Sequence, residues 1–346
     1  MDLTLTPEQV AMAEVVGDLL AGWHERPPTP AQRWAAVSDV GLDAAFLPAD
    51  RGGLGLGLGE LLPALRALGP AAASWPWAAT LVAGPALAHA LGHAPEETAA
   101  GPIGVALVPA QGKPRVRHPD RLHHIAIVGG RKAALIPAAD WAPVARRDLL
   151  DAPSWAQAPD DATARLRPLD TPTDPVAAGR VAEAALLLGV GDRALALAVE
   201  HAKVRQQFGT PIGTFQAVKH LLAEARTELA FADPLVIGAA IAVDRQAPTA
   251  CRDAAIALLA AGAAAEQAVR TSIQVHGGIG YTDEVPLGEL LAAATHGVQA
   301  WGGQAQLNRE VVGALATGSP HIGGADLSAA TDRATVESDP SREEEQ

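Results

Sequence analysis

The sequence has one cysteine and few basic side chains, and both shortages narrow what the protein can be. Cys251 has no second cysteine to pair with, so no disulfide forms within the chain, and its alanine-rich surroundings predict a buried thiol. The 26 Lys and Arg residues stand against 39 Asp and Glu, which gives a formal net charge of -13. Nucleic acids and anionic membranes bind clustered basic residues, so neither is expected as a partner.

Long uninterrupted apolar runs are also missing. The most apolar stretch, residues 255–268, is short, follows Arg252 and Asp253, and contains Glu266, so we interpret it as a core helix rather than a membrane span. No N-terminal stretch combines a basic start, an apolar run and a small-residue cleavage site. We therefore expect a cytoplasmic protein without membrane insertion.

Helix signals open the chain. The stretches 6–9 and 29–32 read TPEQ and TPAQ, each a capping box with proline at the first helical position, and apolar residues follow at helical spacing. Residues 74–92 form another apolar segment, interrupted by Pro76 and Pro85. These patterns predict an N-terminal helical domain over residues 1–100.

The middle of the chain changes character. Short runs with β-branched residues at 103–108 and 122–128, and a run at 131–136 after a Gly-Gly turn, predict strands, with one more around 164–169. We expect a small β domain over residues 101–174. From residue 176 four long helical patterns follow, at 176–203, 214–242, 250–275 and 287–316, and their short connections predict a four-helix bundle over residues 175–317. Residues 318–346 are polar and acidic, and we expect them to be disordered.

The stretch 274–286, QVHGGIGYTDEVP, is the most informative of the chain. Its glycines allow positive φ and close approach of the backbone to a ligand, and Glu284 lies just before a proline that opens the next helix. The glycines could equally cap the preceding helix, and Glu284 could simply favour the positive end of the next helix dipole.

A second stretch favours the first interpretation. Residues 204–216 read VRQQFGTPIGTFQ, one long helix upstream. In this order and spacing the two stretches resemble the acyl-CoA dehydrogenase family, with its patterns R-x-Q-F-G-x-P-I-x-x-F-Q and Q-x-x-G-G-x-G-[YF]-x-x-E-x-P. The resemblance implies a mainly α fold with a small β domain: N-terminal helices, a central β domain and a C-terminal four-helix bundle.

The chemistry implied by the resemblance is FAD-dependent α,β-dehydrogenation of an acyl-CoA thioester. No side chain accepts a hydride, so a flavin must take it, while a base removes the α-proton. The resemblance makes Glu284 that base, and a desolvated pocket would raise its pKa into a useful range. Some relatives carry the base on the first bundle helix, where this sequence offers only Glu183, slightly out of place.

The resemblance also marks cofactor contacts. They are Arg205, Gln207, Phe208, Gln216, Gln274, Gly277 and Gly278, and in the family they reach the flavin of a neighbouring subunit. Arg205 suits the FAD pyrophosphate because its planar guanidinium forms charge-assisted bonds to phosphate oxygens, although it could also serve as a helix C-terminal cation. No metal is expected: His276 stands alone beside glycines, and His123 and His124 on a strand would point to opposite faces.

The departures from the family pattern concern the flavin ring. Residues 101–170 contain neither a T-E-P-x-A-G-S-D segment nor a tryptophan strand that we could assign, and residues 290–296 lack the usual arginine-aspartate pair. The shortened β domain resembles one subunit of heterotetrameric (α2β2) acyl-CoA dehydrogenases that act on steroid side chains. The segments 301–303 (WGG) and 308–310 (NRE) are similar to the ends of those chains.

Three functions therefore remain open. The first is a catalytic subunit of an α2β2 assembly, using Glu284, a bulky acyl-CoA such as a steroid side-chain thioester, and electron-transfer flavoprotein or a similar acceptor. The second is a non-catalytic partner that completes the FAD site of another acyl-CoA dehydrogenase-like chain. The third keeps the fold and changes the reaction to that of an oxidase or flavin monooxygenase.

Overall fold

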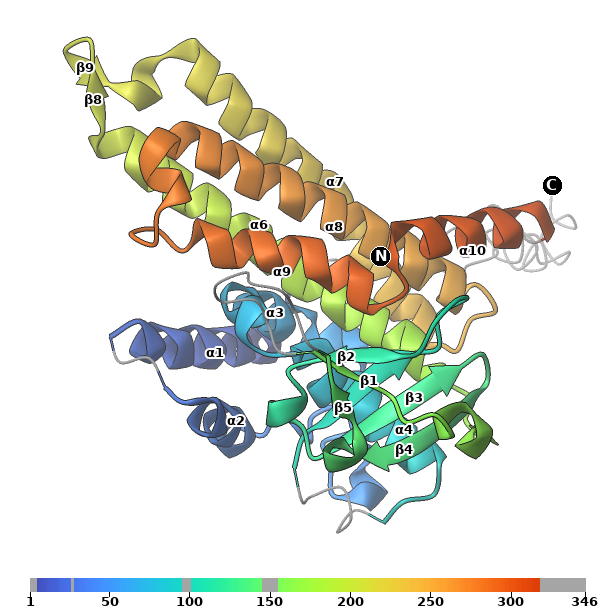
Figure 1. Ribbon diagram of the computed structural model, residues 1–346. Helices are drawn as coiled ribbons and strands as arrows, with labels where there is room; N and C mark the ends of the chain where they lie inside the picture. The colour runs from blue at the N-terminus through green and yellow to red at the C-terminus, as the bar shows by residue number, and fades with distance from the viewer. Residues whose placement is uncertain (1–4, 26–27, 95–100, 145–154, 318–346) are drawn as a thin grey trace, which may run out of the picture.

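The computed structural model describes residues 5–25, 28–94, 101–144 and 155–317 of the 346-residue chain. Figure 1 shows a long helical bundle lying across a smaller layer formed by the N-terminal helices and the β strands. The N-terminal helices are α1 (Pro7–Glu25), α2 (Pro30–Asp39), α3 (Leu58–Leu68) and α4 (Gly84–Ala90). The bundle consists of α6 (Pro175–Val204), α7 (Gln216–Asp244), α8 (Ala250–His276), α9 (Leu287–Ala300) and α10 (Gly303–Thr317).

Both capping boxes form as the sequence predicts. The Thr29 hydroxyl accepts from the Gln32 amide at 3.3 Å, and the Gln32 side chain accepts from the Thr29 amide at 2.9 Å. Thr6 and Gln9 make the same pair of bonds. Stacked indoles then fill the N-terminal core, with Trp77 fully buried between Trp23 and Trp75. Large flat rings bury much apolar surface, so they fix α1 against the segment before α4.

The β domain contains two sheets. The four-stranded sheet has the order β1-β3-β4-β7, with β1 parallel to β3 and the other pairs antiparallel. The three-stranded sheet has the order β2-β6-β5 and is antiparallel. The strands are β1 (Ile103–Leu107), β2 (Arg115–Arg117), β3 (His124–Gly129), β4 (Lys132–Pro137), β5 (Ala142–Pro143), β6 (Trp155–Gln157) and β7 (Arg167–Pro168).

Helix α6 is the central helix of the molecule. Asp174 caps it, because its Oδ1 accepts from the amides of Val176 at 2.8 Å and Ala177 at 3.2 Å. Small residues let neighbours approach closely: a Cβ on Gly189 would lie 1.9 Å from the Arg66 carbonyl oxygen of α3. The bundle and the N-terminal helices therefore share one continuous core.

Several sequence-based expectations need correction. The last bundle helix is two helices, since the chain turns at Trp301 and Gly302 before α10. The segment 74–92 is not a regular helix but contains a π-helical stretch, Ala79–Ala83, before α4. The strand expected around 164–169 is only the short β7, preceded by a 3-10 turn over Ala162–Arg165. Strands β2, β5 and β6 were not predicted, because they are too short to show alternation.

Two further expectations concern single side chains. Cys251 is exposed rather than buried, and its thiol donates to Asp174 Oδ2 at 3.3 Å. The rings of His123 and His124 do not diverge, because His123 precedes β3 and its Nδ1 lies 2.9 Å from that of His124. The expected disorder of residues 318–346 lies outside the described residues. The division into domains at residues 101 and 175 stays a proposal.

Candidate functional site

The antiparallel path of the bundle brings the two motif stretches to one end. Helices α6 and α8 finish there, and α7 and α9 begin there (Figure 1). The rings of His201 on α6 and His276 on α8 stack with centroids 4.3 Å apart. Burial, followed by His276 and Arg205, lowers the pKa of His201. Segments some 70 residues apart in sequence therefore form one surface, which we call the bundle end; it comprises residues 204–216 and 274–286.

A two-residue hairpin projects from the bundle end. Strand β8 (Gln206–Gln207) pairs with β9 (Thr210–Pro211), and the turn residues Phe208 and Gly209 have φ of 51° and 79°. A positive φ is costly for a residue with a side chain, and here it places an aromatic ring in solvent. Phe208 is 93% exposed and touches only the edge of Phe215 among aromatic rings of the described chain.

The glycine stretch forms an open floor beside the hairpin. Gly277 has φ of 65°, and a Cβ built on Gly277 or Gly278 would meet nothing within 4 Å. Gly280 differs, since a Cβ there would lie 2.9 Å from the Ile273 carbonyl oxygen, so its small size serves packing. The first two glycines therefore offer free backbone surface of the kind that a ligand can approach closely.

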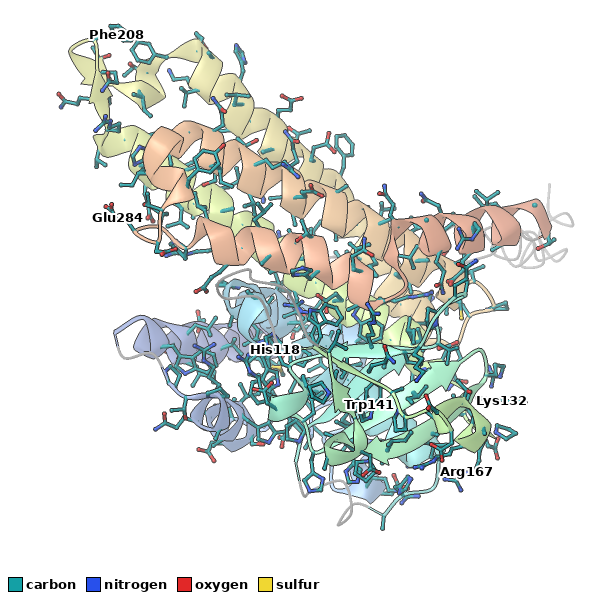
Figure 2. The ribbon with its side chains drawn as sticks, in the orientation of Figure 1. His118, Lys132, Trp141, Arg167, Phe208 and Glu284 are labelled. Carbon is teal, nitrogen blue, oxygen red and sulfur yellow. The ribbon has the colours of Figure 1, made fainter. Side chains whose placement is uncertain are left out.

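Every side chain marked as a cofactor contact is exposed at the bundle end, and so is Glu284. Figure 2 shows Phe208 and Glu284 pointing away from the bundle. None of these residues lines the interdomain pocket described below or either of two other pockets, which lie along α6. The expectation that Glu284 lies in a desolvated pocket is therefore wrong for this chain by itself. Its role as the base stays a prediction.

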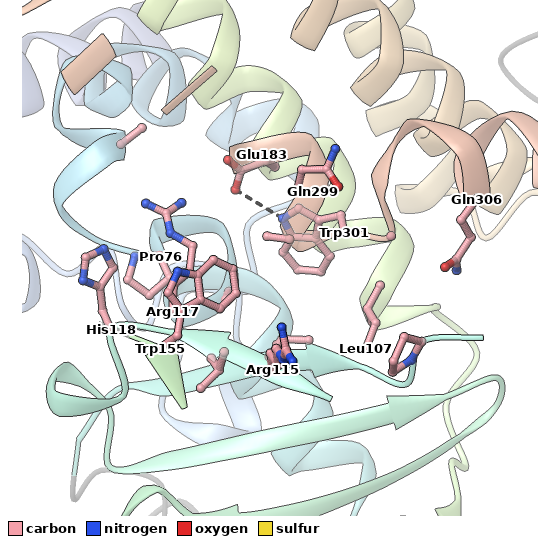
Figure 3. A pocket seen from close by; sticks show the side chains of 18 of the residues that line it. Pro76, Leu107, Arg115, Arg117, His118, Trp155, Glu183, Gln299, Trp301 and Gln306 are labelled. Carbon is pink, nitrogen blue, oxygen red and sulfur yellow. Dashed lines mark hydrogen bonds between the residues drawn. The ribbon is translucent and has the colours of Figure 1, made fainter. Parts of the chain in front are cut away.

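The pocket that combines aromatic walls with titratable groups lies elsewhere, between the β domain and the bundle. This pocket, which we call the interdomain pocket, encloses about 410 Å³. Strands β1, β2 and β6 form one wall, and α6 and the α9–α10 junction form the other (Figure 3). Its aromatic lining comes from Trp75, Trp155 and Trp301.

A partly buried carboxyl group faces this pocket. Trp301 Nε1 donates to Glu183 Oε2 at 3.2 Å, as Figure 3 shows. Burial raises the pKa of Glu183, while the Trp301 hydrogen bond and the charge of Arg117 act in the opposite direction. Glu183, which the sequence offered only as an alternative base, is thus desolvated by the fold, whereas Glu284 is exposed.

Positive charge gathers at the β side of the interdomain pocket. Lys113, Arg115 and Arg117 line it, on and just before β2. His118 follows with φ of 52°, and its buried Nε2 has no hydrogen-bond partner among the described residues. Burial, Arg121 and Arg117 lower the pKa of His118 to about 3, so this ring is neutral at physiological pH. The site can therefore hold an anionic group beside a neutral imidazole.

Sequence reasoning missed the residues of this pocket. Trp155 stands on β6 and lines it, although no tryptophan strand could be assigned from the sequence. The one local sequence signal for this pocket is that Arg115 and Arg117 alternate with the apolar Val116. Alternation over three residues is compatible with a strand. Over the described ranges, no group of three or more His, Cys, Asp or Glu residues could hold a metal ion.

Comparison with known proteins identifies the family. Residues 171–316 match the model of the acyl-CoA dehydrogenase C-terminal domain. The acyl-CoA dehydrogenase IpdE2 of Mycobacterium tuberculosis is 34% identical over 308 residues, covering 82% of this chain and 89% of that protein. The probable acyl-CoA dehydrogenase YngJ of Bacillus subtilis is 39% identical over 116 residues, but that match spans 30% of its length. The chain belongs to the acyl-CoA dehydrogenase family, whose members are typically FAD-dependent.

Solved structures confirm the fold. The chain is similar to one in the ChsE4-ChsE5 complex of Mycobacterium tuberculosis, with a TM-score of 0.72, 24% identity, and coverage of 93% of this chain and 100% of that one. It is also similar to a chain of the steroid ACAD Tcur3481-Tcur3483, with a TM-score of 0.73, 23% identity, and coverage of 90% and 99%. The mainly helical architecture with a small β domain is thus confirmed. No helix in the described ranges is both long and apolar enough to cross a membrane.

Proposed function

We propose that this chain is one subunit of a heteromeric, FAD-dependent acyl-CoA dehydrogenase, and that its bundle end completes the FAD site of a partner subunit. The observation that carries the proposal is that all the marked cofactor contacts are exposed on one surface, outside the interdomain pocket. A dinucleotide on an open surface gains little affinity, because ligand sites bury most of the ligand. The missing wall is supplied by the second chain.

The residues of the bundle end suit this role. Arg205 follows α6 and offers a planar, always charged fork to a pyrophosphate, and the open backbone of Gly277 and Gly278 admits a close approach. Phe208 presents an apolar ring on a strained hairpin turn. Strain of this kind persists where the surrounding structure and function require it, and an exposed aromatic ring fits a buried interface.

The subunit's part in the reaction follows from these positions. When bound, FAD supplies the hydride acceptor that no side chain can provide. The assignment of Glu284 as base requires the partner to desolvate it as well, since Glu284 lies in solvent in this chain, whereas the non-catalytic alternative needs no such change. A steroid side-chain thioester as substrate and electron-transfer flavoprotein as acceptor belong to the same proposal; the steroid ACAD neighbour supports the former.

The test is the flavin content of the chain co-expressed with a full-length acyl-CoA dehydrogenase subunit encoded beside it. We expect the flavin absorbance to appear in the complex and to fall several-fold in Arg205→Ala. Arg245→Ala is the matched control, because it removes an exposed arginine at the other end of α7. Equal flavin in both variants, or full flavin in this chain alone, would refute the shared site.

The same complex tests the role of Glu284 as base and the type of reaction. Glu284→Gln should leave acyl-CoA turnover within about twofold, whereas loss of a general base typically costs 10²–10⁴-fold. A loss of that size would restore Glu284 as the catalytic base. Rapid hydrogen peroxide formation with substrate would instead indicate an oxidase or monooxygenase reaction.

A further inference from the structure

The inner end of the interdomain pocket is closed by one side chain. Trp301 is 2% exposed, and its six-membered ring lies directly over Gly179 of α6. A Cβ built on Gly179 would lie 2.1 Å from Trp301 Cη2 and 2.5 Å from Cζ3. The indole therefore occupies space that exists only because residue 179 has no side chain.

Several contacts hold the indole in this place. Its Nε1 donates to Glu183 at 3.2 Å, and the Trp301 carbonyl oxygen accepts from Arg180 Nη2 at 3.2 Å. Arg180, in turn, forms an ion pair with Glu310 of α10 at 2.6 Å. These bonds tie both ends of Trp301 to α6, so its position is set by the packing of α10 on α6.

The backbone after Trp301 has unusual freedom. Gly302 has φ of 116° and Gly303 has φ of 74°, both in the region that favours glycine. These two residues join α9 to α10 and turn the chain so that the Trp301 side chain points into the pocket. The glycine pair thus determines that an indole, and not backbone, forms the inner wall.

The remaining lining indicates what the pocket would hold. Trp75, Trp155 and Leu107 give apolar walls, and Arg115 gives positive charge at the β side, where Lys113 is paired with Asp160. An apolar body attached to a phosphate-bearing carrier matches both features, and acyl-CoA thioesters have this chemistry. The volume of about 410 Å³ lies toward the lower end of the range of ligand pockets, so an indole at the inner end bears directly on how bulky an acyl group can fit.

We propose that Trp301 is a specificity-determining residue: its indole, seated on Gly179, limits the bulk of the acyl group that the interdomain pocket accepts. The inference rests on the proposed function, since it takes an acyl-CoA as the ligand. Removal of the indole extends the pocket along α6 toward Gly179 and Ala83, which lie beneath the ring.

The first experiment tests the packing of the Trp301 indole against Gly179 without any acyl-CoA. Gly179→Ala should lower the melting temperature of the full chain. The same change in a Trp301→Ala background should lower it much less, because the clash with the indole is gone and only the contact with the Ala83 Cβ, at 2.8 Å, remains. Free indole should raise the melting temperature of Trp301→Ala in a concentration-dependent way and leave the wild-type chain unchanged. If the effects of Gly179→Ala and Trp301→Ala are additive and indole has no effect, the proposed position of the Trp301 indole against Gly179 is wrong.

The second experiment measures specificity in the flavin-containing complex. The dissociation constants of butanoyl-CoA and of a steroid-acid CoA thioester are compared by calorimetry for wild type, Trp301→Phe and Trp301→Ala. We expect the ratio to shift toward the bulky thioester by about tenfold or more in Trp301→Ala and by less in Trp301→Phe. Trp23→Ala, which removes an indole outside the pocket, is the control and should leave the ratio unchanged.

The outcomes separate this inference from the proposed function. If both thioesters bind and the ratio is the same in all variants, Trp301 does not determine specificity, although the chain still acts in an acyl-CoA dehydrogenase. If no variant binds either thioester while indole still stabilises Trp301→Ala, the fold is intact but acyl-CoA does not enter this pocket, and both proposals fail together.

Discussion

The ion pair between Arg180 and Glu310 should contribute strongly to the docking of α10. Arg180 Nη1 lies 2.6 Å from Glu310 Oε2 and Nη2 lies 3.2 Å from Oε1, while the guanidinium is only 5% exposed. Glu310→Gln leaves this buried charge with a neutral amide and the Trp301 carbonyl oxygen. Breaking a buried pair costs about 3–5 kcal/mol, but the Glu310 side chain is 38% exposed, so we expect about 2 kcal/mol.

The assay is urea unfolding of the full chain at pH 7, combined with hydrogen exchange of the α10 amides. Arg180→Met is the reference background, because it removes the buried charge that Glu310 balances. In that background Glu310→Gln should cost less than about 0.5 kcal/mol, and the difference is the coupling energy. An equal cost in both backgrounds would show that the pair does not stabilise the fold.

The same pair predicts an acid dependence. Burial alone would raise the pKa of Glu310, but the hydrogen bonds from Arg180 and Gln306 and the charge of Arg180 hold it below the ordinary value of 4.5. The stabilisation is therefore present above that value and is lost as the pH falls through the lower pKa of the folded state. The difference in stability between wild type and Glu310→Gln should shrink below about pH 4; a constant difference would contradict this pairing.

Three further predictions concern the scaffold. Trp77→Ala should lower the free energy of unfolding by about 3–5 kcal/mol in urea titration, because the residue is fully buried. Asp244→Ala should cost about 1–2 kcal/mol in the same titration, since its carboxylate accepts from the first two amides of α3 at 2.8 and 2.9 Å. Although the Cys251 residue is exposed, partial desolvation of its thiol and the neighbouring Asp174 raise its pKa to about 12. Its alkylation by iodoacetamide should therefore keep accelerating up to pH 10 and beyond, whereas a plateau near pH 9 would refute the shift.

Local sequence patterns predicted the long helices well, because they depend on contacts within a few residues. Capping boxes at Thr6 and Thr29 and the runs that became α6, α7 and α8 are visible without tertiary information. The break at Trp301 was missed, since glycines inside an apolar helical pattern are tolerated as often as they end a helix. Likewise β5, with two residues, was missed because it exists only through its pairing with β6.

The sequence by itself determined the family, the order of the long helices and the residues of the bundle end, because the two motif stretches carry specific residues at fixed spacing. Only the tertiary structure decided that Glu284 lies in solvent and that Glu183 is largely desolvated, since desolvation depends on which elements pack together and not on residue type. It likewise decided that Gly179 and Trp301, some 120 residues apart, fill one another's space. Such complementarity arises from the packing of α10 and its linker on α6, which no local pattern records.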